Sequence, residues 1–267
     1  MRDVFGSGSG FERDPDRDIG GSATGGRASP ARSPSESEQW SVGDVRRSTP
    51  LARGETARPS DPSGLEIDRR VIQMFALVEE AVAGATHALL TGDREAARAL
   101  VANDVAIDSI YLELEQLTSE RVVEGGLSLA ETRWLLAVLS MLPELERSGD
   151  LAEHVAQRAT RNLPSTIPIR ARGYIERMGE VACRMWRMAA DAYADRLENI
   201  GAIDQLDDEM DDLHVRFIAE LVGGVVAVPT AIELALIGRF YERLGDHAVN
   251  ITRRIPSRRV RRTVSAE

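Results

Sequence analysis

The sequence carries one seven-residue block twice, as ERSGDLA at residues 146–152 and as ERLGDHA at residues 242–248. Five of the seven positions are identical, at a spacing of 96 residues. A second pair of blocks matches at a spacing of 103: D-x-x-I-D-x-I-Y at residues 104–111 and D-x-x-M-D-x-L-H at residues 207–214. Two blocks that recur in the same order at similar spacings indicate an internal duplication.

Apolar residues recur at helical spacing around these blocks, from about residue 65 onward, and alternating β-type runs are almost absent. Gly and Pro breaks divide this region into six segments. The pattern predicts helices over residues 65–90, 93–123, 128–162, 169–197, 202–222 and 229–255. Short breaks between long helices predict antiparallel neighbours. We therefore expect an all-α fold of two tandem three-helix bundles, six helices related by a pseudo-twofold repeat.

Two local signals bear on the third of these segments. Ser128 is followed three residues later by Glu131, the spacing of a capping box at a helix N-terminus. Pro143 lies inside the segment, where it removes one backbone hydrogen bond and favours a kink. We expect one kinked helix there.

The ends of the chain differ in composition from its middle. The first 63 residues hold 9 Gly, 11 Ser and 6 Pro and few large apolar residues, which predicts a disordered N-terminal arm. Six arginines between residues 253 and 262 make the C-terminus basic. The expected organisation is an arm over residues 1–63, repeat 1 over 64–163, repeat 2 over 164–255 and a basic tail over 256–267.

Charge and cysteine content narrow the function classes. The net charge is −10, and the region between arm and tail is more acidic still, which argues against a nucleic-acid partner. The single cysteine, Cys183, cannot form an internal disulfide and is expected to pack as a small apolar residue. No apolar stretch is long enough to span a bilayer, and no export signal is evident. We expect a cytoplasmic protein that contacts membranes only through partners.

Acidic residues recur at a spacing of four within both blocks. This spacing places two carboxylates one turn apart on one helix face, where like charges repel. Four such pairs, placed equivalently in two halves, require a compensating cation. The pairs are Asp104 with Asp108, Glu146 with Asp150, Asp207 with Asp211, and Glu242 with Asp246.

Three interpretations of these carboxylates remain open. They form an ordinary solvated flank of each helix, they pair with Arg147 and Arg243, or they hold a metal ion at a surface site. Oxygen ligands suit hard or iron-group ions such as Mg, Mn, Fe or Zn, with His214 as a further donor beside Asp211. Gly149 and Gly245, inside both blocks, favour close helix approach or room beside the carboxylates.

Enzyme motifs are missing from the sequence. No Glu-x-x-His pair of the helical di-iron enzymes occurs. All 33 basic residues are Arg, so a phosphate-binding loop that requires Lys is excluded. We expect neither enzymatic activity nor an organic cofactor.

The two seven-residue blocks, each on the third helix of a repeated three-helix unit, resemble the PhoU family of phosphate-uptake regulators. The resemblance covers about residues 65–255 and looks closest over residues 242–251, with actinobacterial character around residues 149–156. It implies metal ions on the acidic faces, held by Glu146, Asp150, Glu242 and Asp246 with help from Asp104, Asp108, Asp207 and Asp211. Pro143, one turn before the first block, makes the second repeat the stronger expectation.

The resemblance also implies a role and partners. Family members are negative regulators that couple a phosphate ABC transporter ATPase to a sensor histidine kinase, and they often form homodimers. The leading hypothesis is therefore a phosphate-signalling adaptor. The alternative is a metal-binding or metal-storage helical bundle, and a carboxylate-bridged metalloenzyme is a third hypothesis.

Overall fold

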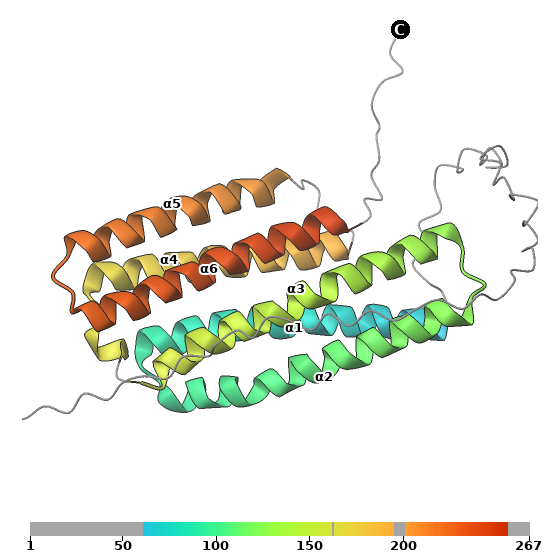
Figure 1. Ribbon diagram of the computed structural model, residues 1–267, viewed down its shortest axis with the longest axis horizontal. Helices are drawn as coiled ribbons and strands as arrows, with labels where there is room; N and C mark the ends of the chain where they lie inside the picture. Colours follow the sequence, from blue (N-terminus) through green and yellow to red (C-terminus); the bar gives the residue numbers. More distant parts are fainter. Residues whose placement is uncertain (1–60, 162, 195–200, 256–267) are drawn as a thin grey trace, which may run out of the picture. The chain divides into compact units, whose positions relative to one another are not determined.

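The computed structural model describes residues 61–161, 163–194 and 201–255, and within these ranges it contains helices and no strand. The helices (Figure 1) are α1 (Pro62–Thr91), α2 (Arg94–Glu124), α3 (Leu129–Ala159), the short 3₁₀ helix η2 (Leu163–Thr166), α4 (Ile169–Tyr193), α5 (Gly201–Gly223) and α6 (Val228–Arg254). The expected all-α class with six long helices is confirmed.

Side-chain caps explain where the first three helices begin. Asp61 accepts a hydrogen bond from the backbone N–H of Gly64, and Asp93 accepts from two N–H groups at the start of α2. The predicted capping box opens α3: the Ser128 hydroxyl accepts from the Glu131 N–H, while the Glu131 carboxylate accepts from the Ser128 N–H. These bonds satisfy donors that a helix N-terminus leaves unpaired.

Two expected boundaries differ from the structure. Because Asp61 caps α1, the helix starts at Pro62, before its expected start near residue 65 and inside the expected arm over residues 1–63. Helix α3 ends at Ala159 rather than near residue 162, because the chain turns at Thr160 and enters η2 around the buried Pro164. Helix α3 runs unbroken through Pro143, which confirms a single helix. The rest of the arm, the tail after residue 255 and residues 195–200 lie outside the described ranges.

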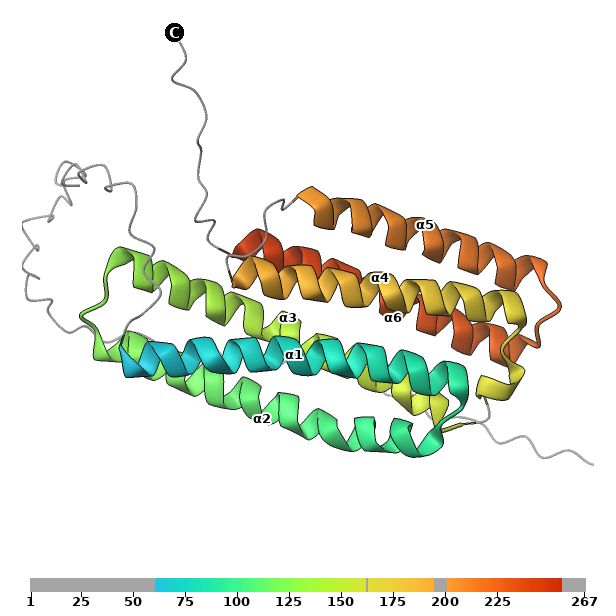
Figure 2. The same cartoon turned by 180° about the vertical axis from the view of Figure 1, so that it is seen from behind.

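The two repeats pack in the same way and contact each other through equivalent helices. In repeat 1 the helices α1, α2 and α3 all contact one another, and α4, α5 and α6 do the same in repeat 2. Between the repeats, α1 packs on α4 and α3 packs on α6 (Figure 2). Each of these pairs joins two helices at the same place in their repeats, as a pseudo-twofold relation requires.

One apolar core runs through both repeats. Phe75 of α1 contacts Trp186 and Tyr193 of α4, with ring centroids 6.2 and 5.7 Å apart, and all three rings are buried. Thr86 of α1 also shares a 2.7 Å hydrogen bond with the hydroxyl of Tyr241 on α6, so this buried polar pair is satisfied. Cys183 packs against this core as expected. Within the described ranges no helix is long and apolar enough to cross a membrane.

Candidate functional site

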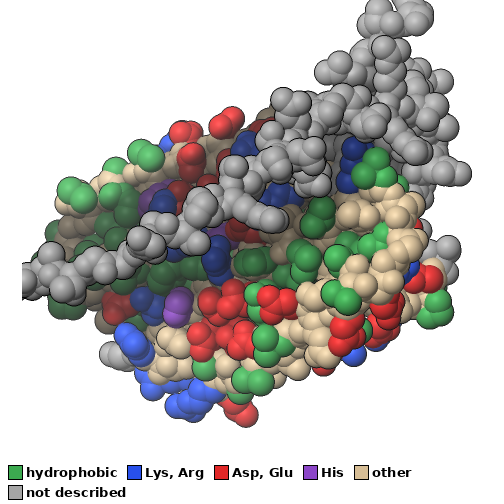
Figure 3. Space-filling model, turned by 45° about the vertical axis from the view of Figure 1, so that its right-hand side comes forward, with side chains coloured by type: hydrophobic (Ala, Val, Ile, Leu, Met, Phe, Trp, Pro, Cys, Tyr) green, Lys and Arg blue, Asp and Glu red, His purple; other side chains and the backbone are tan. Residues whose placement is uncertain are grey.

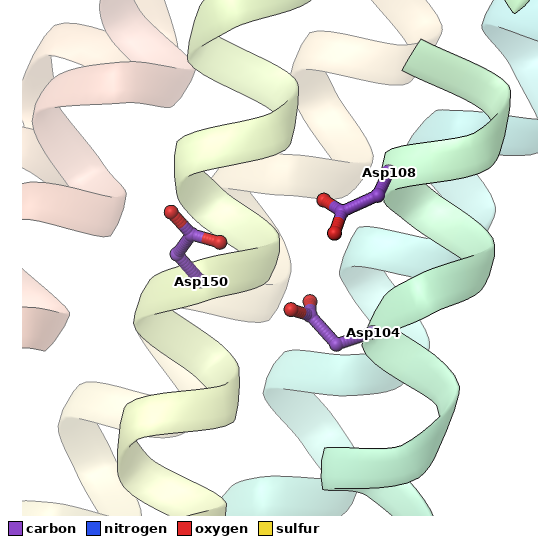
Figure 4. A group of neighbouring side chains, drawn as sticks. All are labelled: Asp104, Asp108 and Asp150. Carbon is purple, nitrogen blue, oxygen red and sulfur yellow. The ribbon is translucent and has the colours of Figure 1, made fainter. Parts of the chain in front are cut away.

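Three aspartates meet between α2 and α3. Asp104 and Asp108 lie one turn apart on α2 and face Asp150 of α3 (Figure 4). One carboxylate oxygen from each residue lies within 4.8 Å of the others. Asp108 is exposed, and Asp104 and Asp150 are half-buried, so the group sits at the surface, where acidic side chains gather on one face (Figure 3). With Glu146, one turn before Asp150, these residues form the first acidic set.

The electrostatics of the first acidic set show an excess of negative charge. Burial, followed by the charges of Asp108 and Glu153, raises the pKa of Asp104 to about 6. Burial and neighbouring carboxylates also raise the pKa of Glu146 and of Asp150, while Arg147 opposes both shifts as a smaller effect. When neighbouring negative charges raise the pKa of a carboxyl group, a bound cation offsets their repulsion and stabilises the ionised form.

Gly149 explains how the two helices come close enough. A Cβ atom at this position would lie 2.9 Å from the Cδ1 atom of Ile107 and 3.2 Å from an oxygen of Asp104. A side chain would therefore push α2 away from α3 and fill the space beside the Asp104 carboxylate. The sequence expectation of close approach at this glycine agrees with the geometry.

The donor set fits a hard cation. All the grouped ligand atoms are carboxylate oxygens, which Mg²⁺, Mn²⁺ and related ions prefer. An ion bound about 2.0–2.6 Å from each oxygen can bridge atoms separated by up to twice that distance, which matches the grouping of the three aspartates. Gly149 keeps a side chain out of the space beside the Asp104 carboxylate.

The second acidic set comprises Asp207 and Asp211 on α5 with Glu242 and Asp246 on α6. Within the described ranges, no three carboxylates of this set lie as close together as the three aspartates of the first acidic set. Asp211 and Asp246 are exposed, and Gly245 faces the end of the Met185 side chain as well as Asp207. Burial and neighbouring acids raise the pKa of Asp207 and of Glu242.

One arginine pairs with a member of the second acidic set, and another pairs with an acid beside it. Arg239 makes an ion pair with Glu242, and Arg253 pairs with Asp204 at 3.0 Å. The charge of Arg253 opposes the upward pKa shift of Asp207, and Arg239 opposes that of Glu242. The expectation that the second repeat is the stronger site is therefore not matched by the grouping of its side chains.

Other sequence expectations have mixed outcomes. Arg147 and Arg243 are exposed, and neither makes an ion pair with a carboxylate of the described chain. His214 is half-buried and lies beside Gly238; its pKa is lowered by burial and by Arg239, while Asp211 opposes that shift.

Three charged residues near these sets were missed from the sequence. Glu153 lies three residues after Asp150, a helical spacing that could have revealed it. Arg239 and Arg253 flank the second block at three residues before Glu242 and seven after Asp246. Their positions outside the repeated block give no sign in the sequence that their side chains reach Glu242 and Asp204.

Comparison with known proteins places these repeats in a family. The PhoU domain model matches residues 71–159 and 175–255, one match for each repeat. The phosphate-specific transport system accessory protein PhoU homolog 2 of Mycobacterium tuberculosis is 30% identical over 197 residues, covering 71% of this chain and 91% of that protein. The corresponding PhoU homolog of Rhizobium meliloti is 26% identical over 194 residues, covering 71% of this chain and 82% of that protein.

Solved structures share the fold. The crystal structure of PhoU from Pseudomonas aeruginosa superposes with a TM-score of 0.67 at 23% identity, covering 72% of this chain and 95% of that one. PhoU from Streptococcus pneumoniae gives 0.64 at 20% identity, covering 72% and 92%. Since the family model covers both repeats and a relative at 30% identity matches over most of its own length, the chain belongs to the PhoU family.

Proposed function

We propose that this protein is a cytoplasmic, non-enzymatic negative regulator of phosphate uptake. It acts as an adaptor between the ATPase of a phosphate ABC transporter and a sensor histidine kinase, and it reaches the membrane only through them. The observation that carries the proposal is the family match to both repeats, together with relatives named as phosphate-specific transport accessory proteins. A homodimer is part of the proposal.

The proposal includes a bound cation at the first acidic set. A divalent or iron-group ion there supplies positive charge that offsets the repulsion among Asp104, Asp108 and Asp150. The grouping of three oxygens within 4.8 Å and the raised pKa of Asp104 support this assignment. Such an ion ties α2 to α3 and stabilises the surface that they form. A storage protein needs many ions per chain, so the one grouped site found within the described ranges favours the adaptor.

Gene deletion tests the regulatory role. Cells that lack the protein should keep phosphatase and phosphate-transporter expression high in phosphate-rich medium, and the wild-type gene should restore repression. Unchanged expression in the deletion strain contradicts the proposal. Pull-down of the wild-type protein from phosphate-rich cells should recover the transporter ATPase and the kinase.

The contribution of the cation is tested by complementation with Asp104→Asn plus Asp150→Asn. These substitutions keep side-chain size and remove charge, so repression should weaken if the ion shapes the binding surface. Asp212→Asn is a matched control, because Asp212 is exposed on α5 and pairs with Arg216 of the same helix. Full repression by the double variant would remove the cation from the regulatory proposal.

A further inference from the structure

Helices α3 and α6, the equivalent helices of the two repeats, pack against each other and run antiparallel. Glu144 of α3 contacts His247 of α6, and further along the same contact Arg158 of α3 pairs with Glu233 of α6 at 2.9 Å. Residue numbers rise along α3 between these two points and fall along α6, so the helix directions are opposite. The pseudo-twofold axis that relates the repeats therefore passes through this contact.

Two arginines face each other where the axis passes. Arg147 of α3 and Arg243 of α6 are equivalent at the spacing of 96, and both are exposed. Each lies one turn from the contact between Glu144 and His247, and because the helices are antiparallel, both lie on the same side of it. Their charges both act on the buried ring of His247 and lower its pKa, after the larger effect of burial. We call Arg147 and Arg243 the central pair.

A second pair of equivalent arginines has counter-ions that the central pair lacks. Arg158 and Arg254 are also related by the spacing of 96. Each reaches an acid on the opposite helix: Arg158 pairs with Glu233 at 2.9 Å, and Arg254 pairs with Glu144 at 2.8 Å. Within residues 61–161, 163–194 and 201–255, the central pair makes no ion pair with a carboxylate. Two like charges thus remain side by side at the contact between the repeats.

The acids beside the central pair are engaged elsewhere. Asp150, one turn after Arg147, faces Asp104 and Asp108 of α2 (Figure 4). Glu242, directly before Arg243, pairs with Arg239. These carboxylates leave the central pair open to an anion from solution, and their negative charge at longer range makes a modest affinity the expectation.

We infer that the central pair binds one tetrahedral phosphoryl oxyanion between α3 and α6. A guanidinium group is planar and always charged, and its forked N–H donors fit two oxygens of a phosphate group. Packed helix axes lie about 8–10 Å apart, a span that two arginine side chains close through one shared anion. At the pseudo-twofold axis the anion receives the same contact from each repeat and ties the two repeats together. The choice of phosphate among oxyanions rests on the proposed function.

Equilibrium dialysis against radiolabelled inorganic phosphate tests the inference on the full-length protein. Metal ions are first stripped with EDTA, and the EDTA is removed, so that phosphate cannot bind through a metal. Wild type should bind one phosphate per chain. Arg147→Gln plus Arg243→Gln should weaken the affinity by about tenfold or more, because charge-assisted hydrogen bonds from both sides are lost.

The matched control removes the same amount of charge at another place. Arg187→Gln plus Arg216→Gln changes two exposed arginines of α4 and α5 that pair with acids on α1 and α5. This variant should bind phosphate as wild type does. An equal loss of affinity in both double variants would overturn the site, since it would reduce the effect to net charge. Absence of phosphate binding to wild type would overturn it as well, provided that ATP does not bind either.

Competition identifies the source of the phosphoryl group. If ATP displaces labelled phosphate at concentrations far below those that inorganic phosphate needs, and only when the central pair is intact, the site stands and its ligand is a nucleotide. If ATP is the weaker competitor, the ligand is free phosphate. Sulfate that competes as well as phosphate overturns the assignment to phosphate. The regulatory role is measured separately through gene expression: a deletion strain that loses repression, with a protein that binds no phosphate or ATP, overturns the anion site alone.

Discussion

Asp104 is the carboxyl group on which burial and negative neighbours act most strongly among the acids of the two sets. Its pKa rises from 3.8 to about 6 in the metal-free protein. The folded state therefore binds a proton more tightly than the unfolded chain does. The resulting destabilisation is absent below about pH 4 and complete above about pH 6, so stability falls as the pH rises through this window.

Asp104→Asn removes this penalty. In EDTA at pH 7 the substitution should raise the free energy of unfolding by about 1–2 kcal/mol, after the roughly 3 kcal/mol of a two-unit shift is reduced for solvent screening of a half-exposed group. At pH 4 the gain should vanish. Urea denaturation at both pH values measures it, with exposed Asp212→Asn as control. An equal gain at both pH values would mean that charge is not the cause.

Sequence spacing was sufficient to identify the carboxylates themselves, because residues four apart share a helix face whatever the fold. It could not rank the two acidic sets. That ranking depends on Arg239 and Arg253, whose side chains reach acids on their own and on a neighbouring helix. Pro143 was expected to weaken the first acidic set, but α3 runs unbroken through it, and the position equivalent to it in repeat 2, at the spacing of 96, is Arg239.

At the scale of the helix, Gly149 sets the distance between α2 and α3. Gly149→Ala should lower the free energy of unfolding by about 1–3 kcal/mol, because the new methyl group would lie 2.9 Å from Ile107. Gly245→Ala should cost less, since the atoms nearest to it belong to the flexible end of Met185 at 3.3 Å.

Gly173→Ala is the control for these helix substitutions. Gly173 is an exposed position within α4 with no neighbour within 4 Å, so alanine there should stabilise the helix by up to about 1 kcal/mol. Chemical denaturation compares the three variants. Stabilisation by Gly149→Ala would contradict close packing as the reason for the glycine.

Helix positions were predictable to within a few residues because caps and breakers are local. Asp93, Ser128 with Glu131, and Gly92 with a φ of 75° mark ends that the sequence alone reveals. The end of α3 was missed because the chain turns at Thr160 and enters η2, where Pro164 is buried, and such burial has no local signature in the sequence.

At the scale of the whole molecule, a buried charge network joins the repeats. Glu144 of α3 is 7% exposed; it contacts Nδ1 of His247 on α6 and pairs with Arg254 at 2.8 Å. The pseudo-symmetric position of Glu144 is Phe240, whose ring lies 4.7 Å from the guanidinium of Arg158, the counterpart of Arg254. One side of the junction therefore joins Glu144 to His247 and Arg254, while on the other side Arg158 lies over Phe240 and also pairs with Glu233 of α6 at 2.9 Å.

Removal of Glu144 should show how much this charge network contributes to the free energy of unfolding. Glu144→Ala leaves a buried histidine without its partner and a half-exposed arginine unpaired, which should cost about 2–4 kcal/mol. Urea denaturation with an unchanged m-value is the measurement. Glu124→Ala, at a carboxylate that is 65% exposed, should change stability by less than about 0.5 kcal/mol. Equal effects of the two substitutions would show that the network contributes nothing.

The sequence revealed the duplication but not this junction, because a repeat pattern states what two halves share and leaves open how they meet. The contact of α1 with α4 and the 2.7 Å bond between Thr86 and Tyr241 have an evolutionary consequence. Once the halves of an ancestral duplication bury their faces against each other, each becomes the other's interior. A substitution at the buried face of one half must then fit the face of the other half. Recombination that exchanges a single half between relatives brings together two faces that did not evolve in contact.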